Sequence, residues 1–139
     1  MQNFAVLVEI IFKLCYYNNV IIKNLTLKDY RSHEDKYFEF DPKFNVLLGK
    51  NAQGKTNILE AIFFAVIGKS FKTSKEKEVI SWGKSTAYIK AEFQKKYRET
   101  KIELFFNENH KKTIKIDDIP IKKNWRTYGH FKCSVFFAR

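Results

Sequence analysis

Residues 46 to 58 read Val46-Leu47-Leu48-Gly49-Lys50-Asn51-Ala52-Gln53-Gly54-Lys55-Thr56-Asn57-Ile58. An apolar run, a loop bounded by glycines and a second apolar run follow one another, which is the pattern of a strand, a phosphate-binding loop and a helix. The loop has the spacing G-x-x-x-x-G-K-T. We therefore expect a strand at Phe44–Leu48, a helix at Asn57–Ile67 and a nucleotide phosphate bound between them.

Each residue type in this loop suits a nucleotide phosphate. Glycine accepts backbone conformations that turn successive N–H groups toward phosphate oxygens. Lys55 supplies a point charge for the outer phosphates, and the hydroxyl of Thr56 is a hard oxygen ligand for Mg²⁺. The helix that starts here adds its positive dipole end. We therefore predict a Mg-nucleotide site in which Thr56 also binds the metal and whose loop residues are Gly49, Lys50, Asn51, Ala52, Gln53, Gly54, Lys55, Thr56 and Asn57.

Length and composition indicate one modest globular domain. The chain has 139 residues, 45% of them hydrophobic and 17% aromatic, which is enough for one packed core and too little for two domains. A net charge of +11 favours a polyanionic partner such as nucleic acid, although charge alone does not identify that partner. Cys15 and Cys133 lie far apart and indicate neither a metal cluster nor a disulfide framework. With three histidines, no Ser/His/Asp or Cys/His catalytic set is evident, so we assign no catalytic residue.

Residues 1–20 form an apolar N-terminal extension of unclear role. They lack the positively charged start and the small-residue cleavage site of a signal peptide. Glu9 and Lys13 interrupt the run, so we do not expect it to span a bilayer. We therefore predict a cytoplasmic protein without a membrane segment, and we place the folded domain at residues 21–139.

The rest of the chain indicates mainly β structure around one helix. Alternating apolar residues predict a first strand from Ile21 and a second at residues 37–40, before a turn at residues 41–42. The helix after the loop is apolar on nearly every side, so it should be buried, and Gly68 should end it. The later expected elements are a short helix near Lys75–Ile80, an antiparallel meander at Thr86–Gln94, Lys101–Phe106 and Lys112–Ile116, a tight turn at Asp117-Asp118, a short helix at Lys122–Tyr128 and a strand at Phe131–Phe137.

Polar residues outside the phosphate loop lead to three further hypotheses. Arg31, between the first two strands, is either a nucleotide contact or a solvated loop charge. His33 is predicted to lie at the surface, because no other His or Cys stands at a metal-binding spacing from it. The basic crossover contacts DNA phosphates or is an ordinary solvated loop; its lysines are Lys69, Lys72, Lys75 and Lys77.

From about Val20 to Ala138 the chain resembles the amino-terminal part of the RecF family, bacterial DNA replication and repair proteins among the SMC-like, ABC-type ATPases. Four segments carry the resemblance, at Ile22–Ser32, Asn45–Ile62, Gly68–Ser74 and Ser134–Phe137. The sequence Asn-Ala-Gln inside the phosphate loop is similar to the RecF and SMC variant of that loop.

The resemblance implies an α/β P-loop NTPase fold, the first lobe of an ABC-type head with a mixed sheet and an antiparallel β segment. It implies that ATP is the nucleotide and that Arg31 lies near its phosphates. It also implies an ATP-dependent homodimer, binding to double-stranded and gapped DNA near single-strand junctions, and a role with RecR and RecO in replication, recombinational repair and the SOS response. The family continues beyond Arg139 with the remaining catalytic groups, so residues 21–139 are expected to be a partial head that is inactive alone.

Two alternatives stay open at this point. The chain also fits the ATPase part of an overcoming-lysogenization-defect type nuclease, which carries a similar loop; an acidic nuclease domain downstream would distinguish it. The second alternative is a nucleotide-binding regulatory module, which an absence of salt-dependent DNA binding would favour.

Overall fold

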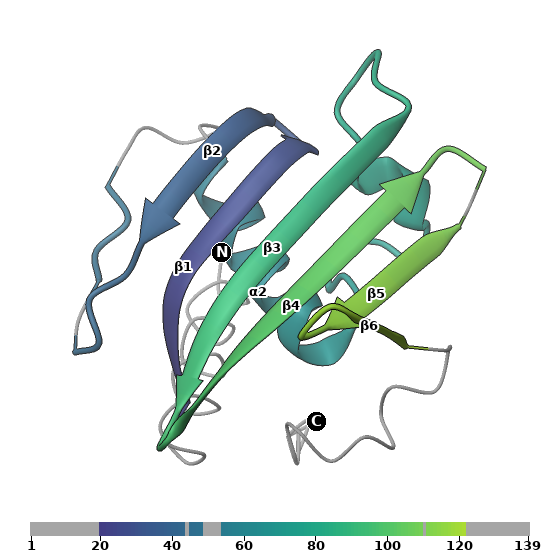
Figure 1. Cartoon of the computed structure of the whole chain (residues 1–139). Coiled ribbons are helices and arrows are strands. Elements are labelled where there is room, and N and C mark those ends of the chain that lie inside the picture. The colour runs from purple at the N-terminus through teal and green to yellow at the C-terminus, as the bar shows by residue number, and fades with distance from the viewer. Residues whose placement is uncertain (1–19, 44, 49–53, 110, 122–139) are drawn as a thin grey trace, which may run out of the picture.

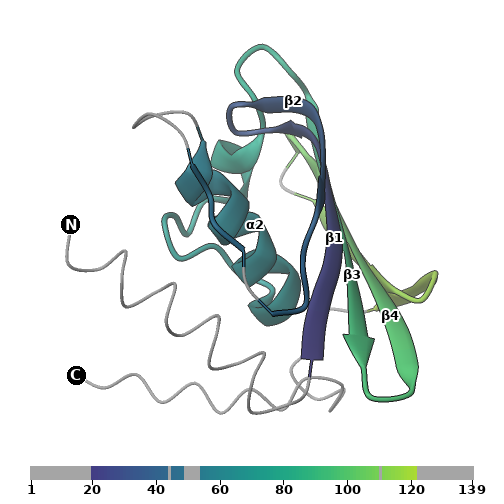
Figure 2. The same ribbon diagram turned by 90° about the vertical axis from the view of Figure 1, so that its left-hand side faces the viewer.

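The computed structural model describes residues 20–43, 45–48, 54–109 and 111–121. These residues form two layers, a twisted antiparallel sheet and one long helix that covers one of its faces (Figures 1 and 2). In chain order the elements are β1 (Val20–Tyr30), β2 (His33–Glu39), α2 (Lys55–Ile67), the 3-10 helix η1 (Glu76–Val79), β3 (Thr86–Lys95), β4 (Arg98–Asn107), β5 (Lys112–Ile116) and β6 (Ile119–Ile121).

The sheet has the strand order β2-β1-β3-β4-β5-β6, and every pairing in it is antiparallel. Strand β1 is therefore held on one side by its own hairpin partner β2 and on the other side by β3, which follows α2 in the chain. A register shift between Ile22 and Asn24 adds one residue to β1. Because of this bulge, Val20 and Ile22 before it and Leu25 and Leu27 after it all contribute to the core.

The core lies between the sheet and α2. Along β3 and β4 every second residue is buried, as expected for a sheet with one covered face. The ring of Phe64 from α2 meets that of Phe106 from β4 edge to face, with centroids 5.0 Å apart. Glu60 is the exception in this helix, a carboxylate that is fully buried among apolar residues.

Most of the expected elements are confirmed. The helix ends as predicted at Gly68, which has φ 77° and donates its N–H to the carbonyl of Phe64 at 2.7 Å. The meander is present, with β5 at the predicted residues and β4 longer than predicted. The turn at Asp117-Asp118 is confirmed by positive φ at both residues. The short helix predicted near Lys75–Ile80 is confirmed in position as η1, although it is a 3-10 helix.

The prediction of a strand at Phe44–Leu48 is wrong for residues 45–48, which are the part of this segment that the structure describes. Residues 45–48 are not in a strand, and Val46 and Leu48 expose 58% and 86% of their surface. A β-strand requires a hydrogen-bonded neighbour, and no described strand pairs with this segment. The described sheet is consequently antiparallel throughout and shows no parallel part of the expected mixed sheet. Phe44 and the elements predicted at Lys122–Tyr128 and Phe131–Phe137 lie outside the described residues.

Candidate nucleotide-binding site

The N-terminus of α2 is suited to an anion. Gly54 precedes the helix in a left-handed conformation, with φ 81° and ψ 12°, and as a glycine it has no side chain to cap the helix. The first turn carries no acidic residue, so nothing in it competes with or repels a phosphate group. Lys55 and Thr56 are the first two helical residues, and both are half-buried. The predicted contacts Gly49–Gln53 lie outside the described residues.

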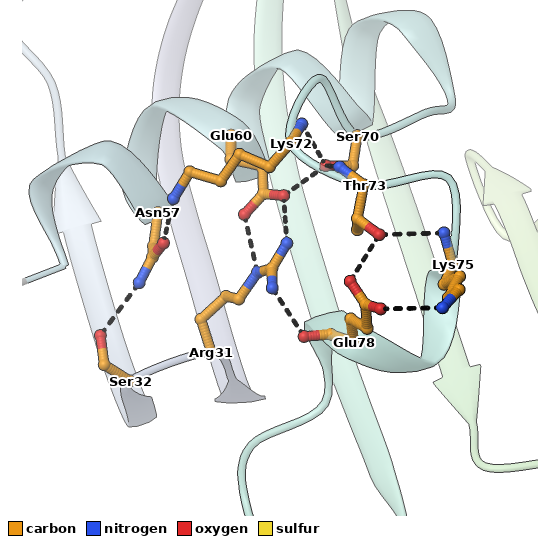
Figure 3. Close-up of polar contacts among 9 residues, drawn as sticks. All are labelled: Arg31, Ser32, Asn57, Glu60, Ser70, Lys72, Thr73, Lys75 and Glu78. Atoms are coloured by element: carbon orange, nitrogen blue, oxygen red, sulfur yellow. Dashed lines mark hydrogen bonds and ion pairs between the residues drawn. The ribbon is translucent and has the colours of Figure 1, made fainter. Parts of the chain in front are cut away.

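The turn between β1 and β2 packs directly on this helix end. The Asn57 amide donates to Ser32 Oγ at 3.1 Å (Figure 3), and His33 Nε2 lies 3.1 Å from the carbonyl oxygen of Gly54. Since a carbonyl only accepts, His33 Nε2 is the donor. A Cβ on residue 54 would lie 2.5 Å from Ser32 Oγ and 2.6 Å from His33 Nε2, so only glycine fits at this position.

The prediction that His33 lies at the surface was wrong. The residue is 6% exposed, and its ring stands edge-on to Phe38 with centroids 6.1 Å apart. It is buried because the β1–β2 hairpin contacts the phosphate-loop helix through this side chain. His33 therefore joins the site as a support for the backbone of Gly54.

Arg31 and Glu60 form a two-bonded ion pair beside the helix end (Figure 3). Arg31 Nη2 lies 2.7 Å from Glu60 Oε1, and Nε lies 3.0 Å from Oε2. A third hydrogen bond of the guanidinium joins Arg31 Nη1 to the carbonyl of Glu78 in η1 at 2.7 Å. Burial by itself would raise the pKa of Glu60, but hydrogen bonds from Arg31 and Ser70 outweigh it and hold that pKa below its ordinary value.

The segment after α2 folds back onto the same network. Ser70 Oγ donates to Glu60 and accepts the backbone N–H of Lys72 at 2.9 Å. The ammonium group of Lys72 then donates to Asn57 Oδ1 at 2.5 Å, as Figure 3 shows. Burial lowers the pKa of Lys72. The β1–β2 turn and residues 70–73 thus bond to the first half of α2, and η1 joins the network through Arg31.

This arrangement divides the four crossover lysines. Lys72 is directed at the helix, and Lys75 lies 3.9 Å from Glu78. Within the described residues no ion pair involves Lys69 or Lys77. The structure therefore does not present all four as one equivalent surface patch, and their contact with DNA stays a prediction.

Glu60, Ser32 and His33 are the site residues that sequence reasoning missed. Glu60 carried a usable signal, because a carboxylate inside a helix that is otherwise almost wholly apolar requires a buried cationic partner. Ser32 and His33 carried no comparable signal. Among the described residues no group of three or more His, Cys, Asp or Glu side chains is placed to hold a metal ion. None of the described helices is long and apolar enough to cross a membrane.

The comparisons with known proteins identify the family of this chain. The AAA domain family matches residues 24–131, so the chain belongs to the AAA-domain class of P-loop ATPases. Within that class its relatives are RecF proteins, which confirms the resemblance seen in the sequence. The DNA replication and repair protein RecF of Clostridium acetobutylicum is 43% identical over 115 residues, and that of Alkaliphilus oremlandii is 37% identical over 117. These alignments cover 83% and 84% of this chain but 32% of each relative.

Solved structures give the same assignment. The recombination mediator protein RecF with ATP, described as part of the RecFOR pathway, is 31% identical, with a TM-score of 0.71 over 74% of this chain and 28% of that one. An SMC head domain from Thermotoga maritima is 20% identical, with a TM-score of 0.60 over 73% of this chain and 39% of its own. That second likeness shows the fold alone. The expected first lobe of an SMC-like head is thereby confirmed.

Proposed function

We propose that this chain supplies the ATP-binding part of a RecF-like ATPase of DNA replication and repair. The observation that carries the proposal is the start of α2, where Gly54 turns in a left-handed conformation and offers no side-chain cap, and where the first turn has no acidic residue. That end follows the motif expected for a phosphate cradle. Similarity to RecF proteins, including one described with ATP, supports ATP as the nucleotide.

The residues at this helix end also fit a magnesium ion bound with the nucleotide. Thr56 provides a hydroxyl oxygen in the first turn, and Mg²⁺ commonly takes few protein ligands together with phosphate oxygens and water. Bound Mg²⁺ would offset the negative charge of the phosphates. Lys55 and the N–H groups of the first turn would orient those phosphates.

Arg31 is proposed to lie near the phosphates as a second basic group. A guanidinium has five N–H donors, and its described bonds to Glu60 and Glu78 use three of them. A phosphate oxygen can therefore accept a remaining N–H without breaking the pair with Glu60. In this proposal Glu60 fixes the direction of the guanidinium.

ATP binding is expected without turnover by this chain alone. Glu60 is the only acidic residue of α2, and it is fully buried and bonded to Arg31 and Ser70. It is therefore not available to position an attacking water. Phosphate release at the level of a buffer blank is the expected result.

For the whole protein we propose double-stranded and gapped DNA as the binding partner, with binding near single-strand junctions. The relatives are named for DNA replication and repair, and the chain carries a net charge of +11. We further propose an ATP-dependent homodimer that acts with RecR and RecO in the cytoplasm, in recombinational repair and the SOS response. Light scattering with and without ATP tests the dimer, using a chain of the relatives' full length.

Calorimetry on Lys55→Ala tests the ATP site. Loss of one charge-assisted phosphate contact is expected to weaken Mg-ATP binding by about one to two decades, which corresponds to about 1.5–3 kcal/mol. Lys36→Ala is the matched control, because Lys36 is an exposed lysine on β2. Equal ATP affinity in folded Lys55→Ala and in the parent chain would overturn the proposal.

A further inference from the structure

Trp82 is a large aromatic side chain with no cover. Its relative exposure is 101%, the highest among the exposed large hydrophobic residues described. It lies between η1 and β3, in a segment that projects past the end of the strands at the top of Figure 1. Tryptophan ordinarily buries a large apolar surface and is enriched where proteins bind other molecules. The exposed ring therefore points to a binding role.

The backbone on both sides of Trp82 is firmly held. Ser81 donates its N–H to the carbonyl of Asp29 at 2.8 Å and its hydroxyl to the carbonyl of Arg31 at 2.7 Å. The N–H of Lys84 donates to the carbonyl of Ser81 at 3.0 Å, which closes the turn. A ring carried on a fixed turn binds with little loss of backbone entropy. The same bonds connect Trp82 to Arg31 and hence to the nucleotide site.

The charge around this turn favours an anionic ligand. Residues 69–84 contain five lysines and two glutamates. Both glutamates are engaged, Glu76 with Lys112 and Glu78 with Thr73 and Lys75. The ammonium group of Lys84 reaches Asp29 at 3.3 Å, and the Lys84 side chain as a whole is about half exposed. Lys84 is thus a basic residue within the turn that carries the ring, and both glutamates of residues 69–84 already have partners.

The residues next to the ring argue for stacking and against a protein interface. Within the turn, Trp82 is flanked by Ser81, Gly83, Lys84 and Ser85, none of which is apolar, while the preceding Val79 is buried and Ile80 is half-buried. A protein hot spot is normally surrounded by further contact residues that exclude water. An exposed ring with a lysine two residues away instead matches the sites that bind unpaired nucleotides, where a base stacks on an aromatic face and a lysine contacts a phosphate.

We propose that Trp82 stacks on an unpaired base of a DNA strand, with Lys84 beside the adjoining phosphate. The proposal rests on the proposed function in DNA repair and specifies which form of DNA this part of the chain recognises. It predicts a preference for DNA with a single-stranded segment over a fully paired duplex.

The test compares Trp82→Ala with Tyr97→Ala. Tyr97 is 90% exposed and has Lys96 5.3 Å from its ring centre, but it lies in the β3–β4 turn, at the other end of β3. Fluorescence anisotropy with a labelled oligothymidine strand should show about tenfold weaker binding for Trp82→Ala, since stacking on one base typically contributes about that much or more. Tyr97→Ala and a blunt duplex probe should show little change.

Three further readouts separate the outcomes. Trp82→Phe should retain part of the affinity, and the urea midpoint of Trp82→Ala should equal that of the parent, because an exposed ring supports no packing. Unchanged oligothymidine affinity in Trp82→Ala, or an equal loss with the duplex, would overturn the stacking proposal. ATP affinity measured on the same samples should stay unchanged, so failure of stacking is distinguishable from failure of the ATP site.

Discussion

Arg31 and Glu60 join the β1–β2 turn to the phosphate-loop helix through two nearly parallel hydrogen bonds of 2.7 and 3.0 Å. The Glu60 side chain is completely buried, whereas that of Arg31 is 19% exposed. A carboxylate without water depends on its partner for charge compensation. The position of the turn against α2 is therefore coupled to the charge state of this pair.

Removing only the arginine should be severely destabilising. Arg31→Met leaves Glu60 charged and buried, and we expect the free energy of unfolding to fall by about 3–5 kcal/mol. The double variant Arg31→Met with Glu60→Met should regain much of that loss, because it removes both charges. Urea unfolding measures both effects. Lys23→Met is the control, since the Lys23–Glu99 pair has a similar distance of 2.7 Å but lies at the surface; its midpoint should be nearly unchanged.

Stability should also depend on acid pH through Glu60. The pKa of this carboxyl lies below its ordinary value of 4.5 in the folded chain, so the pair stabilises the fold above that pH. As the pH falls through 4.5 toward the folded-state pKa, this contribution is lost. Unfolding midpoints measured across this range should fall in the parent and change less in Glu60→Gln. If the unfolding midpoint depended on pH equally in the parent and in Glu60→Gln, the role assigned to Glu60 would be contradicted.

Gly54 should be replaceable by no other residue, for two separable reasons. Alanine at this position meets both left-handed strain, at φ 81°, and the side chains of Ser32 and His33 within 2.6 Å. Gly83→Ala isolates the first effect, because Gly83 has φ 77° and nothing within 4 Å of an added Cβ. We expect about 1–2 kcal/mol of destabilisation for Gly83→Ala and an additional 1–3 kcal/mol, roughly, for Gly54→Ala. Similar losses of stability in Gly54→Ala and Gly83→Ala would show that the side chains of Ser32 and His33 move aside at little cost.

Lys112 should stabilise the C-terminal end of α2. Its ammonium group donates to the carbonyl of Gly68 at 2.9 Å, pairs with Glu76 and lies 5.2 Å from the ring centre of Phe64. Lys112→Met keeps the aliphatic stem and removes these contacts, which we expect to cost about 1–2 kcal/mol in urea unfolding. Lys115→Met on the same strand is the control, since Lys115 is exposed and should tolerate the change. A cost no greater than that of the control would contradict this role.

The elements that sequence reasoning located depend on neighbouring residues. The helix from Lys55 to Ile67 follows from its glycine boundaries, and the meander follows from alternation within each strand. The contacts that sequence reasoning missed join residues that are distant in the chain. Glu60 meets Arg31 29 residues away, and His33 meets Gly54 21 residues away.

The segment 45–48 shows why one strand could not be predicted reliably. Its apolar composition favours a strand, but a strand forms only beside a partner, and composition does not show where that partner lies. Arg31 illustrates the complementary case for the site. The family resemblance predicts that Arg31 lies near the phosphates, whereas the fold shows the carboxylate of Glu60 that holds its guanidinium.

The strand order determines which strands of the sheet can pair early in folding and which must wait. Leu25 of β1 pairs with Ala91 of β3, so α2 and both flanking loops lie inside the loop that this pairing closes. Strands β3 to β6 are joined by short turns and can pair as soon as they are made, while β1 must wait for β3. On a ribosome, β1, β2 and α2 emerge before β3, and the apolar surfaces that β3 covers stay exposed until β3 has left the exit tunnel. In the interval before β3 appears, a nascent chain therefore exposes apolar surface to which a chaperone can bind.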